Sequence, residues 1–174
     1  MAAPSGAPTA LDVITMGRCS IDLYGQQIGS RLEDMGSFAK SVGGSPSNIA
    51  IGTARLGLRS GLITRVGDEQ MGRFVLEQMT REGVSTRGIT TDPARLTSLV
   101  LLAVESDKTF PLIFYRDNCA DSALSEDDVD EDFIRSAGAL LVTGTHFARE
   151  VNDKAQRKAM ALAKKHGRRI IIDI

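Results

Sequence analysis

The chain has 174 residues, of which 42% are hydrophobic and 25% are charged. This length and composition are enough for one ordinary apolar core, and they exclude collagen-like, disordered and disulfide-rich classes of protein. The 21 Lys and Arg residues are balanced by 22 Asp and Glu residues, which gives a formal net charge of −1. Because no excess positive charge is present to attract nucleic acid or an anionic membrane, we expect a small-molecule partner.

Cysteine spacing and the ends of the chain indicate a reduced, cytoplasmic protein. Cys19 and Cys119 lie far apart and form no Cys-x-x-Cys pair, so neither a zinc framework nor a redox motif is expected. The longest apolar run, 99–104, is far too short to cross a membrane, and the chain does not begin with a basic region followed by an apolar one. We expect residues 1–10 to form a disordered tail and residues 11–174 to form the folded part.

Apolar runs and turn residues predict strands and helices in alternation along the first part of the chain. Strands are expected at 13–16, 21–24, 38–42 and 61–66. Ser45 is expected to cap a helix that ends at Gly57, and Asp68 to cap a second helix that ends at Gly83. The apolar face of the first helix is expected to carry Ile49, Thr53 and Leu56, and that of the second Met71, Phe74, Val75, Gln78 and Met79.

The second part of the chain contains a predicted hairpin and an acidic run. Residues 99–104 and 109–115 are apolar and are joined by a polar turn, so they should pair as antiparallel strands. Ser125 and Asp128 have the spacing of a capping box. We interpret the acids of 126–132 as the solvated start of a short helix, with metal binding as the alternative.

A strand, a helix and another strand are predicted to follow. The strand covers 139–142, the helix ends at Gly167, and 169–174 begins another buried strand. One stripe of the helix carries Ala155, Ala159, Leu162, Ala163 and His166. The alternation of strands and helices predicts an α/β fold with a mainly parallel sheet and right-handed crossovers, and the hairpins predict a small extra sheet beside it.

The glycine pair at Gly43 and Gly44 is the most informative segment for chemistry. Two glycines directly before a helix let backbone N–H groups approach a ligand closely, and Asn48 projects from the first helical turn. Such a terminus suits hydroxyl or anionic groups. The segment lacks the lysine of a Gly-x-x-x-x-Gly-Lys nucleotide loop and the spacing of Gly-x-Gly-x-x-Gly. A tight turn without a ligand remains the alternative.

Two charged residues follow predicted strands. Asp22 comes just after the first strand, where an open α/β sheet places its ligand crevice, and a carboxylate accepts two sugar hydroxyls at once. A surface acid is the alternative for Asp22. The guanidinium of Arg116 suits a forked interaction with a ligand carboxylate, or a salt bridge to its neighbour Asp117. His146 lies in a predicted strand-end loop, with pocket lining as the alternative role, whereas His166 is interpreted as a helix-end residue.

Several segments resemble the ribokinase-like (pfkB) sugar kinases, and the resemblance covers Val13 to Ile174. The block from Gly43 to Gly57 looks like the N-terminal signature of that family. Within the family, 36–38 and 114–121 look like the 5-dehydro-2-deoxygluconokinases of myo-inositol catabolism, or the neighbouring 2-keto-3-deoxygluconate kinases. The segments that carry the resemblance are Gly17-Arg-Cys-Ser-Ile-Asp22, Gly43-Gly-Ser-Pro-Ser-Asn48 with 49–57, Arg65-Val-Gly-Asp-Glu-Gln-Met-Gly72 and Ile170-Ile-Ile-Asp173.

The resemblance implies a Rossmann-type sheet flanked by helices, with a small β lid built from approximately 21–42 and 98–116. It also implies transfer of the γ-phosphate of ATP, assisted by Mg²⁺, to a primary hydroxyl of 5-dehydro-2-deoxy-D-gluconate. Separately, we expect a homodimer through the lid sheet. A fructokinase, a ribokinase and a non-catalytic sugar-binding or assembly module are the alternatives.

The resemblance assigns roles to individual residues. Asp22 and Asn48 would bind sugar hydroxyls, and the N–H groups of Gly43 and Gly44 would contact the same ligand. Ser20 stands where ribokinases have an Asn beside that aspartate.

Two further residues are assigned in the same way. Arg116 matches the arginine of the Tyr-Arg motif in the sugar-acid members, and our hypothesis is that it receives the substrate carboxylate. Asp173 begins the family's Asp-x-Asn-x-Arg element and is assigned to the nucleotide side of the site. The Gly-Ala-Gly-Asp segment that supplies the family's catalytic base does not occur in these 174 residues. We therefore expect the substrate-binding part of a longer kinase, inactive by itself, without the C-terminal half of the fold.

Overall fold

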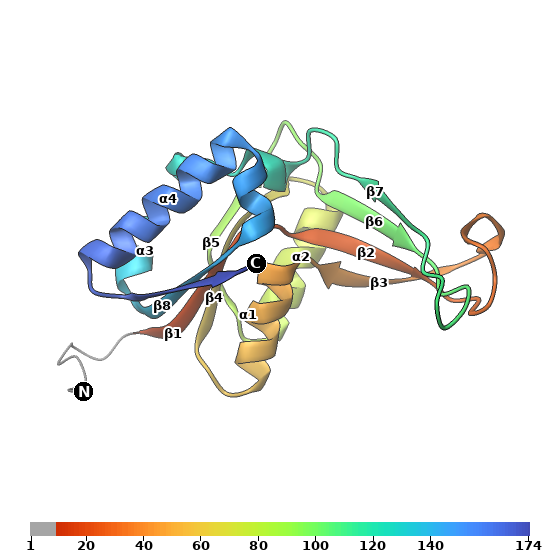
Figure 1. Ribbon diagram of the computed structural model, residues 1–174, viewed down its shortest axis with the longest axis horizontal. Coiled ribbons are helices and arrows are strands. Elements are labelled where there is room, and N and C mark those ends of the chain that lie inside the picture. The colour runs from red at the N-terminus through yellow and green to blue at the C-terminus, as the bar shows by residue number, and fades with distance from the viewer. Residues whose placement is uncertain (1–9) are drawn as a thin grey trace.

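The structure, a computed structural model, describes residues 10–174 (Figure 1). The tail expected at 1–10 lies outside the described residues, except for Ala10. The main sheet has five strands in the order β5-β4-β1-β8-β9, and all neighbouring pairs are parallel. Its strands are β1 (Leu11–Met16), β4 (Ser60–Gly67), β5 (Ser85–Asp92), β8 (Ala137–Thr143) and β9 (Arg169–Asp173).

A second, smaller sheet projects from one end of the main sheet (Figure 1). Its strands are β2 (Ser20–Gly25), β3 (Phe38–Gly43), β6 (Ser98–Leu102) and β7 (Leu112–Tyr115), in the order β3-β2-β6-β7. The β6 and β7 strands are antiparallel, which confirms the predicted hairpin. We call these four strands the small sheet.

Helices cover both faces of the main sheet (Figure 1). The helices are α1 (Ser45–Arg55), α2 (Gln70–Arg81), α3 (Glu131–Arg135) and α4 (Glu150–Lys165). On the face of α1 and α2, the core includes Leu62, Val66, Val75 and Met79. On the face of α3 and α4, it includes Ile14, Phe133, Leu140, Ala155, Ala159 and Ala163. Because the central strands are buried on both faces, they form near-continuous apolar runs, as parallel strands do. The predicted fold class is confirmed.

Short 3₁₀ turns complete the chain, at Leu32–Asp34, Ala120–Ala123, Glu126–Asp128 and Gly144–Ala148. The capping box of Ser125 and Asp128 is confirmed, although it opens one of these turns, and Asp130 caps α3. No group of three or more potential metal ligands occurs in residues 10–174. No helix in that range is long and apolar enough to cross a membrane. Both cysteines are free and buried.

The predicted helix caps are each wrong by one residue. Gly44, not Ser45, is the N-cap of α1, because its positive φ of 98° turns the chain into the helix. The N-cap of α2 is Glu69, not Asp68, because the longer Glu69 side chain reaches the N–H groups of Met71 and Gly72.

The apolar face predicted for α1 is also wrong. Leu56 is 84% exposed, and the buried residues of α1 are Pro46, Ser47 and Ala50. These small residues let the start of the helix pack closely on β1, where the Thr15 hydroxyl donates to the carbonyl oxygen of Pro46 at 2.8 Å. The first turn of the helix therefore packs closely on the sheet, and Ile51 and Ala54 pack against the core further along.

Three strand predictions need correction. Asp22 lies within β2, not just after the first strand. The β9 strand was expected to be buried, but all five of its residues are exposed because it pairs only with β8, at the edge of the described sheet. The β5 strand was not predicted, because its sequence, STRGITTD, lacks a clear apolar pattern; it forms the other edge.

Candidate functional site

Buried hydroxyl groups fix the loop that joins β1 to β2, at the carboxyl end of the main sheet. The Thr64 hydroxyl donates to the carbonyl oxygen of Gly17 at 2.7 Å. The Ser98 hydroxyl donates to the carbonyl oxygen of Cys19 at 2.8 Å. Because Thr64 belongs to the main sheet and Ser98 to the small sheet, both sheets hold this loop in place. Burial raises the pKa of Cys19 to about 12, so its thiol stays protonated and structural.

The glycine pair lets two groups approach the backbone more closely than a residue with a Cβ atom would permit. At Gly43, a Cβ atom would collide with the carboxylate of Asp22. At Gly44, a Cβ atom would collide with the carbonyl oxygen of Arg18. The glycines therefore bring the Asp22 carboxylate and the β1–β2 loop directly against the turn that starts α1.

Asp22 lies beside two of the other predicted ligand residues. Its Oδ1 accepts a hydrogen bond of 2.9 Å from the hydroxyl of Ser20. Asp22 and Asn48 both line a cavity of about 330 Å³, together with Tyr24 and Lys40. The structure thus brings together Ser20, Asp22, Gly43, Gly44 and Asn48, which are separated by up to 28 positions in the sequence.

A row of residues crosses the small sheet at the level of Asp22. Asp22 pairs with Ser41 on one side and with Val100 on the other, and Val100 pairs with Phe114. Residues that are directly opposite in neighbouring strands share a face of the sheet. Asp22 and Phe114 therefore lie on the same face, about 10 Å apart across two strand spacings.

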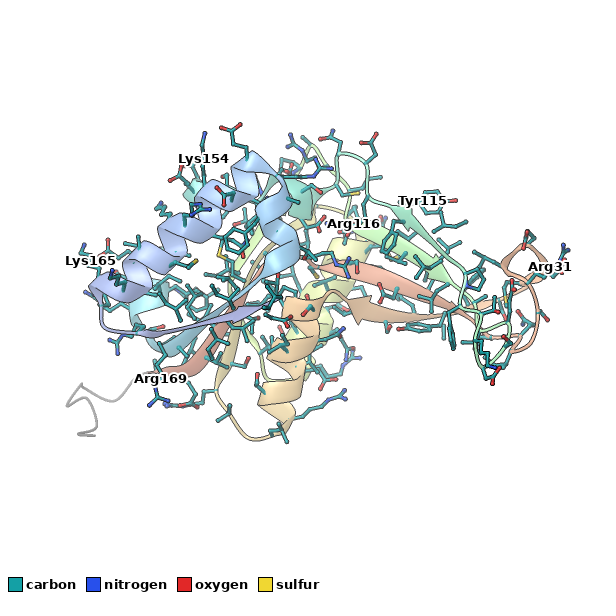
Figure 2. All side chains as sticks on the ribbon, in the orientation of Figure 1. Arg31, Tyr115, Arg116, Lys154, Lys165 and Arg169 are labelled. Atoms are coloured by element: carbon teal, nitrogen blue, oxygen red, sulfur yellow. The ribbon has the colours of Figure 1, made fainter. Side chains whose placement is uncertain are left out.

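Arg116 lies just beyond this row, at the base of the small sheet (Figure 2). Its Nη2 donates to Oδ2 of Asp121, which is fully buried. The sequence left two partners open for Arg116, a ligand carboxylate and Asp117. The salt bridge of Arg116 is with Asp121 and not with Asp117. Neither Oδ1 of Asp121 nor Nε of Arg116 has a hydrogen-bond partner within residues 10–174.

His146 packs against this ion pair. Its Nε2 is 3.3 Å from the carbonyl oxygen of Asp121, and its side chain is buried. Burial lowers the pKa of His146, and this effect exceeds the opposite effect of the Asp121 charge. The imidazole is therefore a neutral packing group at pH 7. His166 lies at the end of α4 and contacts Glu131 at 2.7 Å, as expected for a helix-end residue.

Asp173 is brought close to the glycine turn from the far end of the chain. Its Oδ2 accepts a hydrogen bond of 2.7 Å from the hydroxyl of Ser45. The end of β9 therefore lies beside the start of α1 (Figure 1). The residue assigned to the nucleotide side thus contacts the same helix terminus as the residues assigned to the sugar.

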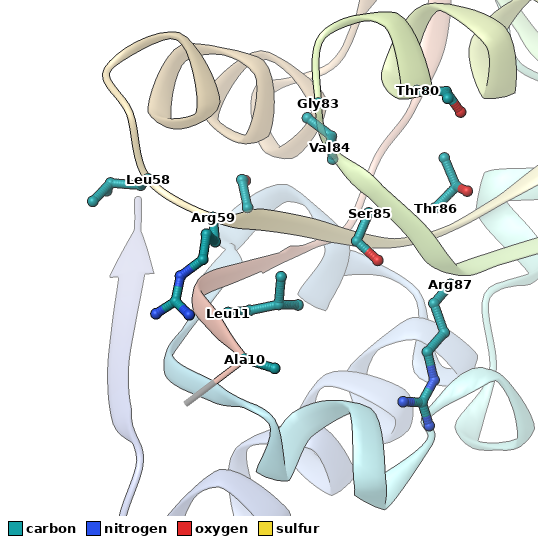
Figure 3. A pocket seen from close by; sticks show the side chains of 11 residues that line it. Ala10, Leu11, Leu58, Arg59, Thr80, Gly83, Val84, Ser85, Thr86 and Arg87 are labelled. Carbon is teal, nitrogen blue, oxygen red and sulfur yellow. The ribbon is translucent and has the colours of Figure 1, made fainter. Parts of the chain in front are cut away.

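Two other cavities lie away from this constellation. One, of about 730 Å³, lies at the amino ends of β1, β4 and β5 (Figure 3). Open α/β sheets bind ligands at the carboxyl ends of their strands, and its arginines, Arg59 and Arg87, are already paired with Asp12 and Asp130. The other, of about 610 Å³, is largely apolar and lies at the base of the small sheet, beside Met71 of α2.

Comparison with known proteins identifies the relatives of this fold. The family model described as pfkB family carbohydrate kinase matches residues 10–174. The chain belongs to the pfkB family of carbohydrate kinases. This family membership confirms the resemblance carried by the glycine-pair block.

Individual relatives agree with the family. A 5-dehydro-2-deoxygluconokinase of Geobacillus kaustophilus is 41% identical over 165 residues, which are 94% of this chain and 49% of that protein. The crystal structure of a PfkB protein from Polaromonas sp. JS666 matches with a TM-score of 0.87 and 33% identity, over 94% of this chain and 55% of that one. A sugar kinase from Pyrococcus horikoshii in complex with ATP matches with a TM-score of 0.81 and 28% identity, over 93% of this chain and 52% of that one. The chain thus spans about half the length of the curated relatives it matches.

Two charged residues near this constellation were given no role by reasoning from the sequence. Arg18 lies inside the Gly17–Asp22 segment, and Asp121 ends the 114–121 segment, so both were quoted without a role. The signal available for Arg18 was a charged residue between two small neighbours, Gly17 and Cys19. Only the folded chain shows that the two lie near the same strand ends.

Proposed function

We propose that the protein carrying this chain is a sugar-acid kinase that phosphorylates a primary hydroxyl of 5-dehydro-2-deoxy-D-gluconate with ATP. The family supports a carbohydrate kinase. The name of the Geobacillus relative, which is 41% identical to this chain, supports the particular sugar acid. Within the protein, this chain would supply the substrate-binding part.

The observation that carries the proposal is that Asp22 and Phe114 lie on the same face of the small sheet, with Arg116 two residues beyond Phe114. At one end, the Asp22 carboxylate would accept two sugar hydroxyls, the Asn48 amide would bind a third, and the turn at Gly43 and Gly44 would offer backbone N–H groups. At the other end, beyond Phe114, Arg116 would receive the carboxylate. An open-chain six-carbon acid has both kinds of group, whereas fructose and ribose have only the first.

ATP and Mg²⁺ enter the proposal through the family. Residues 10–174 contain no group of three potential metal ligands, and we assign no Mg²⁺ ligand among them. Asp173 is the one residue that we assign to the nucleotide side, where its carboxylate is held by Ser45. Phosphoryl transfer depends on positioning and charge stabilisation. What this chain would contribute is positioning: it holds the acceptor sugar in one orientation against the start of α1.

Replacing Arg116 by Lys is expected to raise the KM for the sugar acid about tenfold, because an ammonium keeps the charge but loses the forked geometry. Lys is preferred to Ala because removal of the whole cation would leave the buried Asp121 charge unpaired, at a cost of about 3–5 kcal/mol. The measurement is steady-state kinetics with the sugar acid and with fructose, which has no carboxylate. An equal rise in KM for both sugars would show that Arg116 does not bind the carboxylate.

The non-catalytic alternative makes a different prediction for the same protein. A sugar-binding or assembly module would bind the sugar acid in calorimetry without ATP and would show no turnover when ATP and Mg²⁺ are added. A 2-keto-3-deoxygluconate kinase, a fructokinase and a ribokinase are separated from our proposal by which sugar is phosphorylated with the highest kcat/KM.

We also propose that the small sheet is the lid of the site and that a second copy of the protein packs on it. All four residues of β7 are exposed, including Ile113 and Tyr115, and within residues 10–174 β7 pairs only with β6. An exposed apolar edge strand favours association. Sedimentation should detect a dimer, and Ile113→Asp should shift it towards the monomer. A wild-type protein that stays monomeric at high concentration would refute this assembly.

A further inference from the structure

Arg18 occupies a central place in the site and has no assigned role. It lies in the loop between β1 and β2, and its carbonyl oxygen touches the glycine turn, where it accepts a hydrogen bond of 3.4 Å from the Ser47 hydroxyl. Its guanidinium carbon is 5.9 Å from the centroid of the Phe114 ring. The backbone of Arg18 therefore contacts the start of α1, and its guanidinium lies near Phe114 of β7.

The two arginines at this end of the row differ in how their charges are balanced. Arg116 forms a salt bridge with Asp121. Within residues 10–174, no acidic side chain lies within ion-pair distance of Arg18. Arg18 is also only partly exposed, so its charge is less screened than that of a fully solvated arginine.

The Asp121 charge limits what Arg116 achieves by itself. A ligand carboxylate that approaches Arg116 is attracted by the guanidinium and repelled by Asp121, since like charges at close range oppose each other. Because Asp121 is fully buried, water screens this repulsion poorly. The pair therefore offers direction and hydrogen-bond donors but little net charge. The charges of both Arg116 and Arg18 lower the pKa of His146, which agrees with two cations near one imidazole.

We propose that Arg18 is a specificity-determining residue, which supplies the net positive charge that selects a sugar acid over a neutral sugar. Asp121 holds the Arg116 guanidinium in one orientation, and Arg116 binds the ligand carboxylate from that position. Arg18, which lies over the face of Phe114, balances the charge of the ligand carboxylate. Contact with an aromatic ring is a common way to hold an arginine without neutralising it. The inference rests on the proposed function, because it assumes a substrate that bears a carboxylate.

The test compares three variants of the protein that carries this chain. Arg18→Met keeps the length of the side chain and removes its charge, and Arg18→Lys keeps the charge. Arg31→Met is the matched control, because it removes one positive charge from the far tip of the same small sheet (Figure 2). Kinetics are measured with 5-dehydro-2-deoxy-D-gluconate and with fructose, at low and at high salt.

We expect Arg18→Met to raise the KM for the sugar acid about tenfold or more, with kcat and the KM for fructose changed less than about twofold. Arg18→Lys should restore most of the affinity, and Arg31→Met should behave as wild type. High salt should raise the KM of the wild type for the sugar acid and have a smaller effect on Arg18→Met, because salt weakens attraction between charges. A merely structural role would not produce this dependence on charge and salt.

The possible failures are distinguishable. If the wild type prefers the sugar acid but Arg18→Met has the same KM for it, or a KM raised equally for both sugars, the role of Arg18 is refuted and the proposed function stands. If the wild type phosphorylates fructose as well as the sugar acid, the proposed function fails, and the role of Arg18 fails with it.

Discussion

Replacement of Asp22 by Asn should lower kcat/KM for the sugar acid by about 10- to 100-fold and leave the fold intact. In our proposal the carboxylate accepts two sugar hydroxyls, and hydrogen bonds to a charged partner contribute about 1.5–3 kcal/mol each. Asn has nearly the same shape, so the close packing of residue 22 on Gly43 is retained. Steady-state kinetics and circular dichroism of the variant would measure the two effects separately.

Asp107→Asn is the matched control for this variant. Asp107 is exposed in the turn between β6 and β7, and it makes no hydrogen bond with its side chain inside the part of the chain that the structure describes. The same loss of charge there should change kcat/KM by less than about twofold. If Asp22→Asn also stayed within twofold, the residue would be a surface acid, which is the alternative that the sequence left open.

Replacement of Gly44 by Ala should be the most damaging single methyl addition in the site. The positive φ of 98° is costly for Ala, and the new Cβ would collide with the carbonyl oxygen of Arg18. Strain and collision together should lower the free energy of unfolding by about 3 kcal/mol or more. That loss corresponds to a decrease of about 6–12 °C in Tm, measured by calorimetry. The shifted turn should also raise the KM for the sugar.

Gly57→Ala separates strain from collision. Gly57 has a similar φ of 89°, at the end of α1, but a Cβ there would meet nothing within 4 Å. Gly57→Ala should therefore lower the free energy of unfolding by only about 1 kcal/mol and leave the KM for the sugar unchanged. Equal effects at Gly44 and Gly57 would contradict the close approach of the Arg18 loop to the glycine turn.

Much of the fold could be predicted from the sequence because its strong signals are local. The strands at β1, β4 and β8 are continuous apolar runs, and the alanine stripe of α4 has helical spacing, so each was placed within a few residues. The cap errors at Ser45 and Asp68 arose because two neighbouring residues competed to start each helix. The choice depended on backbone φ at Gly44 and on side-chain reach at Glu69, neither of which a pattern of residue types contains.

The β5 and β9 strands were harder because edge strands have less to bury. The polar residues of β5 hide its extended conformation, and the isoleucines of β9 suggest burial although one side of the strand is open in this chain. Position within a sheet is a property of the whole topology, so a local run of residues does not determine it.

The candidate site was predictable where a residue stood inside a recognisable motif. The glycine pair, Asn48 and Asp22 were assigned in this way, and the folded chain brings them together around one helix start. The partner of Arg116 was not found, because Asp121 is five positions away and its burial depends on packing around His146. The proximity of Arg18 to Phe114 spans nearly a hundred residues of sequence and depends on the register of the small sheet.

We propose that the region between Asp22 and the two arginines selects a sugar acid. The most direct measurement is kcat/KM of the protein carrying this chain, with ATP and Mg²⁺, for 5-dehydro-2-deoxy-D-gluconate, 2-keto-3-deoxygluconate, fructose and ribose. We predict the highest value for 5-dehydro-2-deoxy-D-gluconate, at least about tenfold above the two sugars without a carboxylate. An equal or higher kcat/KM for fructose or ribose would show that the site does not select a sugar acid.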